Sequence, residues 1–304
     1  MLNCLGRSGS TWVTHLLGQH PEIITYGSFQ LEPRLAGYWM DVLGTLAEPA
    51  SYTQALQPEV TGDEWWIGKN RRTTLSLEPI DPDLTAWLGG SAIESLAAFC
   101  MGRVEAFYQR AAESQGKKGA RFFAERSYGV GTFAPQIVRE LYAGAREVFL
   151  VRDFRDVFSS MRAFKGSSLP RRHLAKSDAE YVRNQLREYV AGLYRSWQAQ
   201  KDSAFLLRYE DLVRHPKETL TSLLEFIGVE AGPLIVERVI ASARMVRSDR
   251  QDRHKTTTDP LSSVGRWVRE LEPDVRQAFE ERYVDILSEF GYSIDVVETA
   301  EPVP

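Results

Sequence analysis

Residues 3–14 read NCLGRSGSTWVT, and this stretch decides the predicted fold. The apolar opening over residues 1–5 predicts a short strand, and the residues from Ser10 to Gly18 predict a helix. The glycines between them let the backbone approach an oxyanion, and the N-terminus of the helix supplies donors and positive potential. The stretch predicts a phosphate-binding loop, and a glycine-rich turn without a ligand is the alternative.

One residue of this loop separates it from the nucleoside-triphosphatase loop. There a lysine stands before the Ser/Thr and reaches the β- and γ-phosphates, while the hydroxyl holds magnesium. Ser10 occupies the position of that lysine, so the sequence does not support the same role. Arg7, at the front of the loop, offers instead a planar fork that suits a smaller anion.

The rest of the chain alternates short apolar runs with segments of helical periodicity. The runs ARFFAE (120–125), REVFLV (146–151) and SAFLLRY (203–209) predict buried parallel strands. Helical spacing occurs over residues 91–114, 178–200, 216–228 and 273–290. This order predicts an α/β fold of the P-loop type, with three α/β/α layers and a central parallel sheet. The ligand is expected at the C-terminal ends of the strands.

Residues 33–90 follow no clear period and are rich in tryptophan and proline. We expect a helical or irregular lid, forming with the next helix an acceptor-binding insertion over about 33–115 within one domain of residues 1–304. Its aromatic and basic side chains either stack on a sugar or aryl group and steer an acidic acceptor, or fill the core of the insertion itself. These side chains are Tyr38, Trp39, Trp65, Trp66, Trp87, Lys69, Arg71 and Arg72.

Composition narrows the classes of function. The chain has 304 residues, 43% of them hydrophobic, which is enough for a large core. A net charge of −4 argues against a general nucleic-acid binder, which needs a basic surface. Cys4 and Cys100 lack metal-type spacing, so we expect reduced core residues.

No apolar run is long enough for a membrane span, and no leader-type pattern is present, so a soluble cytoplasmic protein is expected. The sequence leaves open the oligomeric state and whether the chain is one domain of a longer protein.

A second polar cluster, VRDFRDVFSS, covers residues 151–160. Arg152 lies at a predicted strand end, and Ser160 follows about two turns along the next predicted helix. Both can face one phosphate if the strand end and the helix converge. The alternative is an ordinary ion pair between Arg152 and Asp153 or Asp156.

Together these segments resemble a known family. GRSGSTW (6–12) and VRDFRDVFSS, with LRYEDLVRHPKETLTSLLEFIGV (207–229) and SSVGRWVREL (262–271), are similar to the sulfotransferases that use 3′-phosphoadenosine-5′-phosphosulfate (PAPS). The resemblance is weak in the N-terminal quarter and good over residues 119–290. It implies that the first loop holds the 5′-phosphosulfate and that Arg152 and Ser160 hold the 3′-phosphate. By position, the loop residues in the first role are Arg7, Ser8, Gly9, Ser10 and Thr11, with Trp12 beside them.

The resemblance also explains Ser10. The donor has no β–γ phosphate pair and the family requires no metal, so a lysine at position 10 would have nothing to reach. We therefore expect PAPS as co-substrate, adenosine 3′,5′-bisphosphate (PAP) as product, and no metal site.

The wording RSGST is closest to the tyrosylprotein and carbohydrate branches and to bacterial relatives. In those branches a glutamate shortly after the first helix deprotonates the acceptor hydroxyl, which implies Glu32 in FQLEPRL (29–35). The cytosolic branch uses a histidine in a later segment, and no histidine occurs between His20 and His173. Without the resemblance, Glu32 would read as a solvated loop carboxylate.

Three further residues take roles by resemblance. Arg126 in FAERSYG stands where the family has a lysine near the sulfuryl group, and arginine keeps the charge but donates a proton poorly. Tyr209 corresponds to a residue near adenine, with a core tyrosine as the alternative. Arg266 corresponds to a basic residue that closes over the donor, and Trp267 is expected to pack beneath it.

The predicted function is sulfuryl transfer from PAPS to a hydroxyl on a carbohydrate, a glycolipid or another small metabolite. In-line displacement would use Glu32 as general base, with Arg7, Arg126 and Arg266 supplying positive charge. One alternative is a P-loop nucleotide kinase, but such an enzyme would need the loop lysine that this sequence replaces by Ser10. The other is a non-catalytic nucleotide-binding scaffold, which would not explain why Glu32, Arg126 and Arg266 occur together.

Overall fold

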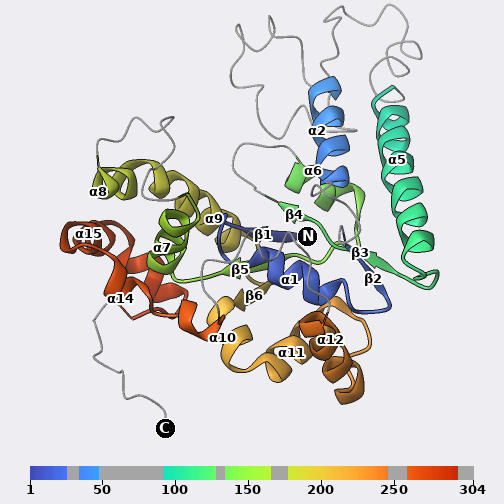
Figure 1. The fold of residues 1–304 in the computed structure, drawn as a ribbon. Coiled ribbons are helices and arrows are strands. Elements are labelled where there is room, and N and C mark those ends of the chain that lie inside the picture. The colour runs from blue at the N-terminus through green and yellow to red at the C-terminus, as the bar shows by residue number, and fades with distance from the viewer. Residues whose placement is uncertain (26–33, 48–91, 128–133, 166–176, 246–258, 294–304) are drawn as a thin grey trace, which may run out of the picture.

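The structure is a computed structural model, which describes residues 1–25, 34–47, 92–127, 134–165, 177–245 and 259–293. The other segments are drawn in grey in Figure 1. Glu32 and most of the predicted lid, including Trp65, Trp66, Trp87, Lys69, Arg71 and Arg72, lie outside the described residues.

A parallel four-stranded sheet forms the centre of the fold. Its strands are β1 (Leu2–Cys4), β4 (Arg126–Ser127), β5 (Val148–Val151) and β6 (Phe205–Arg208), in the order β4-β1-β5-β6. Leu2 pairs with Arg126 on one side and with Val148 on the other. β1 and β5 are buried throughout because helices cover both faces of the sheet. The polar Asn3 of β1 donates to Glu147 at 2.8 Å. The predicted α/β class with a central parallel sheet is confirmed.

One face of the sheet is covered by α1 (Ser10–Leu17), α10 (Tyr209–Arg214), α11 (Pro216–Ile227) and α12 (Pro233–Met245). Leu2, Val148 and Leu207 of the strands are buried against these helices. Pro216 starts α11 because its fixed φ suits a first helical turn, and Gly228, at φ 85°, ends it in the left-handed region.

The opposite face is covered by α7 (Phe154–Lys165), α8 (Asp178–Tyr181), α9 (Arg187–Gln200), α14 (Trp267–Glu270) and α15 (Pro273–Glu289). Figure 1 shows α7, α8, α14 and α15 together on the left of the sheet. Phe149 and Val151 point into this second core. A turn of π-helix over Val182–Leu186 joins α8 to α9 within the segment 178–200 that was predicted as helical.

A third apolar cluster lies beside the sheet and contains α2 (Leu35–Ala47), α5 (Ala92–Ser114) and α6 (Ala134–Leu141). It also takes side chains from a separate two-stranded sheet made of β2 (Ile23–Ile24) and β3 (Phe122–Phe123). The single strand predicted over 120–125 is therefore wrong in detail. Phe122–Phe123 of this segment form β3 in the small sheet, and the residues that follow shortly after, Arg126–Ser127, form β4 in the main sheet.

The lid was expected to be helical or irregular, but the bounds of helix α2 were not predicted, since residues 33–90 show no clear period. Ala36, Met40 and Leu43 are buried at helical spacing, but two glycines and adjacent aromatic residues obscure that period. Cys4 and Cys100 are buried and unbridged, as expected. Among the described helices, none combines the length and apolar character that crossing a membrane requires.

Candidate active site

The loop between β1 and α1 has an unusual backbone. Arg7 has φ 71° and Gly9 has φ 91°, and Arg7 is the one non-glycine residue with positive φ in the described part of the chain. Such a conformation is unfavourable for an arginine and commonly marks a functional loop. Gly9 caps α1 without a side-chain hydrogen bond, so the first amides of the helix face the loop. The predicted phosphate-binding geometry is thus present at the C-terminal end of β1.

Arg7 joins the two predicted clusters. Its Nε donates to Ser160 Oγ at 3.2 Å, and its carbonyl oxygen accepts from Arg152 Nη1 at 3.2 Å. The Arg7 guanidinium also lies 4.4 Å from the centre of the Phe164 ring on α7. The strand end and the helix therefore converge, as the sequence required for Arg152 and Ser160 to act together.

Arg152 is buried, with 4% of its surface exposed, and it is tied to three elements. Besides the carbonyl of Arg7, it donates from Nη2 to the carbonyl of Ser263 at 2.6 Å, and it lies 4.7 Å from the centre of the Tyr209 ring. The alternative from the sequence, an ion pair of Arg152 with Asp153 or Asp156, does not occur among the described residues. Asp153 pairs with Arg155 at 2.8 Å, and Asp156 binds two backbone amides.

Tyr209 lies directly against the loop. A Cβ at Gly9 would meet Tyr209 Cδ2 at 2.4 Å, so only glycine fits beneath the ring. The Tyr209 hydroxyl is hydrogen-bonded to Ser263 Oγ at 3.1 Å. Tyr209 is buried in the first core as well, so both interpretations of this residue hold in part.

Arg126 reaches the loop from the neighbouring strand. Its Nη1 donates to Ser10 Oγ at 2.5 Å, and both residues are buried. Arg126 on β4 thus places a positive charge at Ser10, the position at which the nucleoside-triphosphatase loop carries a lysine. A cavity of about 650 Å³ borders Arg126; its wall includes Tyr38 and Phe123.

Glu125 is a functional candidate that the sequence reasoning did not single out. Its carboxylate accepts from the amides of Ala36 at 2.8 Å and Gly37 at 3.2 Å, at the start of α2, and from the hydroxyl of Tyr108 on α5. Burial raises the pKa of Glu125. Glu125 holds α2 and its neighbour Arg126 holds the loop, and the Glu-Arg pair in FAERSYG was the available signal.

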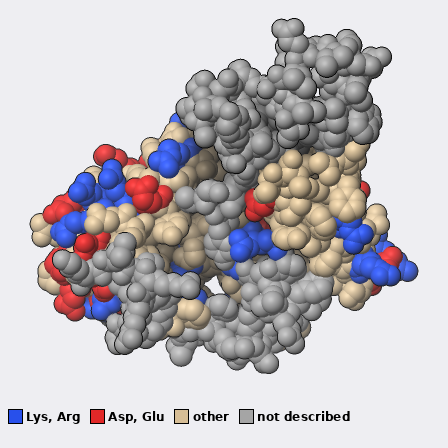
Figure 2. Space-filling model, turned by 90° about the horizontal axis from the view of Figure 1, so that it is seen from above, with Lys and Arg blue, Asp and Glu red and all other residues tan. Residues whose placement is uncertain are grey.

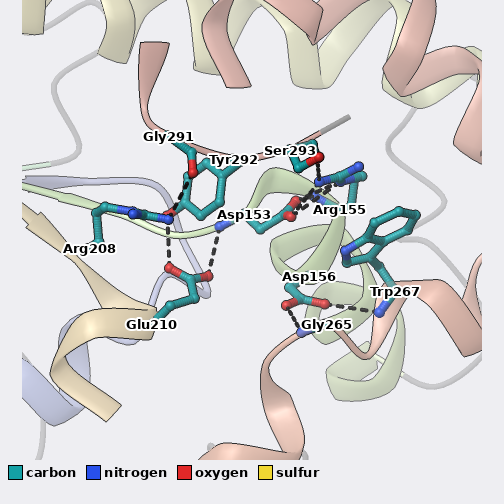
Figure 3. Close-up of polar contacts among 10 residues, drawn as sticks. All are labelled: Asp153, Arg155, Asp156, Arg208, Glu210, Gly265, Trp267, Gly291, Tyr292 and Ser293. Atoms are coloured by element: carbon teal, nitrogen blue, oxygen red, sulfur yellow. Dashed lines mark hydrogen bonds and ion pairs between the residues drawn. The ribbon is translucent and has the colours of Figure 1, made fainter. Parts of the chain in front are cut away.

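The C-terminal turn is attached to α7 by a second buried carboxylate. Asp156 Oδ2 accepts from the amide of Gly265 at 2.7 Å, and Oδ1 accepts from the amide of Trp267 at 2.9 Å (Figure 3). Arg266, between them, is buried and forms an ion pair with Glu270 at 2.8 Å. The guanidinium that stacks on Trp267, at 3.8 Å, belongs to Arg155 and not to Arg266, which corrects the expected packing.

A further buried carboxylate completes this network. Glu210 accepts from the amide of Asp153 at 3.1 Å and from the hydroxyl of Tyr292 at 2.8 Å, and Figure 3 shows these contacts beside the Asp153–Arg155 pair. Burial raises the pKa of Glu210. It acts on the backbone where β5 passes into α7, and nothing in the sequence pattern marked it.

The structure thus brings most of the expected residues to the C-terminal side of the sheet. Direct contacts link Arg7, Ser10, Arg126, Arg152, Ser160 and Tyr209 to the loop or to each other. Ser8 is buried in the loop, and the carbonyl of Thr11 accepts from the Thr14 hydroxyl. Trp12 packs against the first core. Arg266 is placed through its turn, while Glu32 lies outside the described residues.

Charge on the surface is mixed. Figure 2 shows Lys/Arg and Asp/Glu side chains next to one another at the left end of the molecule, where Figure 1 places α8 and α15. Within the described ranges, no group of three or more His, Cys, Asp or Glu side chains is arranged to hold a metal ion. Of the cations at the loop, Arg126 and Arg152 are buried and Arg7 is half-buried.

Comparisons with known proteins agree with this fold. A sequence model of the sulfotransferase family matches residues 2–233. No match is found among curated proteins. Among solved structures, the sulfotransferase domain of the Synechococcus PCC 7002 olefin synthase is similar, with 19% identity, 92% of each chain covered and a TM-score of 0.50. The sulfotransferase domain from the curacin biosynthetic pathway is similar at 15% identity, with 97% of each chain covered and a TM-score of 0.50.

These two likenesses concern the fold alone, since both identities are low. The family match extends from the first strand to the start of α12 and includes the loop, the Arg152–Ser160 segment and Tyr209. On that evidence the chain belongs to the sulfotransferase family.

Proposed function

We propose that the protein transfers a sulfuryl group from PAPS to a hydroxyl of a small-molecule or carbohydrate acceptor. The observation that carries this proposal is the position of Arg7, whose backbone binds Arg152 and whose side chain binds Ser160. Two anion-binding elements far apart in sequence meet there. A donor with a 5′-phosphosulfate and a 3′-phosphate requires such a pair of neighbouring sites.

The residues present fit this donor. Arg152 Nε is buried and has no hydrogen-bond partner among the described groups, although buried polar atoms are nearly always paired. An anion at this point would satisfy it. The Tyr209 ring lies against Gly9 and under the Arg152 guanidinium, and we place the adenine on this side of the loop. We assign the 3′-phosphate to Arg152 and Ser160, and the 5′-phosphosulfate to residues 7–11 with Trp12 beside them.

The proposed chemistry depends on placing charge. Sulfuryl transfer is similar to phosphoryl transfer, in which in-line positioning and cations stabilise the charge that develops on the transferred group and the leaving oxygen. Arg126, held on Ser10, is placed to stabilise the leaving-group charge. Arg7 and Arg266 add positive charge at the front of the loop and from the C-terminal turn. Arg126 acts as a cation and not as a proton donor, because guanidinium remains protonated.

We assign the general base to Glu32, which precedes α2 by a few residues. The contacts of Glu125 with the first amides of α2 fix the end of the segment that carries Glu32. The cavity beside Arg126 is large enough for a small molecule and is bordered by apolar side chains such as Phe123 and Val138. We place the acceptor on this side of Arg126.

The decisive experiment has two parts. First, binding of PAP is compared with binding of ATP plus magnesium by thermal shift and calorimetry; selective stabilisation by PAP is expected, and selective stabilisation by ATP with magnesium would favour a kinase. Second, the protein is incubated with PAPS and a library of hydroxyl-bearing metabolites and glycans, and sulfated products are detected by mass spectrometry. PAP binding with no product from any acceptor, and no PAPS consumption, would favour a non-catalytic scaffold.

A further inference from the structure

Asp156 is completely buried, and both of its carboxylate oxygens are used on one short turn. One oxygen accepts from the amide of Gly265 and the other from the amide of Trp267, so the two bonds enclose Arg266 in the chain (Figure 3). Gly265 has φ 70°, a left-handed conformation that glycine adopts without steric cost, and the bonds to Asp156 fix the turn in it. The backbone from which the Arg266 side chain leaves the turn is therefore held by a residue on α7, while the guanidinium itself pairs with Glu270.

The same turn is attached to the donor side at its beginning. The carbonyl of Ser263 accepts from Arg152, and the hydroxyl of Ser263 is bonded to Tyr209. The Trp267 ring at the other end stacks under Arg155. Helix α7 also carries Ser160, which contacts Arg7. One helix thus contacts both the phosphate loop and the turn that carries Arg266.

We propose that Asp156 is a positioning residue that holds Arg266 at the donor site by binding the two amides on either side of it. This proposal rests on the proposed function, because it assumes that Arg266 faces the donor. Asp156 itself touches neither donor nor acceptor. It acts through the turn, and its loss leaves the charge of Arg266 in place but not its direction.

A carboxylate is needed for this arrangement because two amides point at one side chain. An asparagine of the same size has one carbonyl oxygen, and its NH₂ group would face an N–H that also needs an acceptor. The charged groups that act on Asp156 are Arg152 at the end of β5, which lowers its pKa, and Asp153, which raises it. Burial raises the pKa of Asp156 to about 6, so at neutral pH the carboxylate form predominates.

The test uses Asp156→Asn with Glu210→Gln as a matched control. Glu210 is also a buried carboxylate that accepts a backbone amide in this network, but its bonds go to Asp153 and Tyr292 and not to the turn. Asp156→Asn is expected to weaken PAP binding roughly tenfold, the effect of losing one hydrogen bond to a charged group. Because Glu210 also holds the backbone next to Arg152, its variant is the control for the turn amides only. The control for PAP binding is Glu147→Gln, a buried carboxylate bonded to Asn3 and Arg139, which is expected to change PAP binding by less than twofold.

A double-mutant cycle separates positioning from general damage. If Asp156 acts through Arg266, Asp156→Asn added to Arg266→Ala will weaken PAP binding by less than twofold further. A full tenfold further loss would show that Asp156 affects the donor by another route, and the proposal would be wrong. If Asp156→Asn does not fold, protonation of Asp156 replaces the substitution: PAP binding is measured at pH 7.5 and at pH 5.5 for the wild type and for Arg266→Ala. Phosphate titration affects both proteins equally, so only the wild type should lose the additional affinity.

A measurement without ligand keeps the two proposals apart. Hydrogen exchange of the Gly265 and Trp267 amides is expected to be at least tenfold faster in Asp156→Asn than in the wild type, and unchanged in Glu210→Gln. If the wild type fails to bind PAP while this exchange result holds, the proposed function is wrong and the hold of Asp156 on the turn stands. Unchanged exchange in Asp156→Asn contradicts the positioning role whatever the ligand.

Discussion

Replacing Arg152 by alanine should selectively remove affinity for the 3′-phosphate of the donor. Arg152 is buried, its Nε lacks a partner among the described groups, and its two other nitrogens are fixed on the carbonyls of Arg7 and Ser263. The guanidinium is therefore held in place before any ligand arrives. A preorganised cation of this kind binds an anion without a further cost in side-chain entropy.

The size of the effect follows from the type of contact. A hydrogen bond to a charged group contributes about 1.5–3 kcal/mol, which corresponds to roughly 10- to 150-fold in a dissociation constant. Arg152→Ala also removes the bond to the Ser263 carbonyl, and that loss affects every nucleotide. The quantity to compare is therefore the ratio of the affinities for PAP and for adenosine 5′-monophosphate, which lacks the 3′-phosphate.

Isothermal titration calorimetry measures both ligands on the wild type, Arg152→Ala and a control. Arg139→Ala is a suitable control, because it removes an arginine that is paired with Glu147 at 3.1 Å, away from the loop. The affinity ratio should fall at least tenfold in Arg152→Ala and stay constant in Arg139→Ala. Equal losses for PAP and for the monophosphate in Arg152→Ala would refute the assignment of the 3′-phosphate to this residue.

Four other predictions concern the metal, the base and two buried carboxylates. Turnover should survive excess chelator, because Ser10 replaces the lysine of the triphosphate loop; loss on chelation with recovery on adding magnesium would reopen the kinase interpretation. Glu32→Gln should lower transfer to an alcohol roughly 10²-fold or more with PAP binding nearly unchanged and much less loss for a nitrophenolate, whereas near-normal turnover would place the base elsewhere. The raised pKa of Asp156, about 6, means that the folded state binds more protons than the unfolded state below pH 6. Lowering the pH from 7 to 5 should therefore raise the free energy of unfolding of the wild type by about 1 kcal/mol relative to that of Asp156→Asn, as measured by denaturant titration. A difference between the two proteins that stays constant with pH would contradict the raised pKa. Glu125→Gln should lower stability by about 1–2 kcal/mol, since the start of α2 loses its charged acceptor, while the exposed Glu105→Gln should not; equal melting temperatures of all three proteins would count against this.

Much of the fold was predictable because its signals are local. The apolar runs that became β1, β5 and β6 are each flanked by polar residues, and the long amphipathic segments that became α5, α11 and α15 repeat at helical spacing. The loop residues were predictable for a similar reason. Gly9 and Ser10 stand next to each other in the chain, and their meaning depends on the helix that follows at once.

What the sequence did not reveal depends on contacts between distant segments. The chain over 120–125 is apolar enough for one strand, but its pairing with β2 is decided by Ile23 and Ile24, about 100 residues earlier in the sequence. Glu125, Asp156 and Glu210 bind backbone amides, and an amide leaves no trace in the residue types of its segment. Trp267 was expected to pack beneath Arg266, but α7 brings the guanidinium of Arg155 to 3.8 Å from the centre of the Trp267 ring.

The position of Arg126 on β4 bears on how the protein behaves at high concentration. β4 is the outer strand of the main sheet, and it is two residues long, so it offers few backbone groups to which another chain can pair. A charged side chain that points inward from an edge strand protects a sheet against edge-to-edge aggregation. A slip by one residue would also turn Arg126 away from Ser10. Apolar replacements at position 126 should therefore lower the soluble yield as well as the activity, and a poor yield of such variants says nothing about the chemistry.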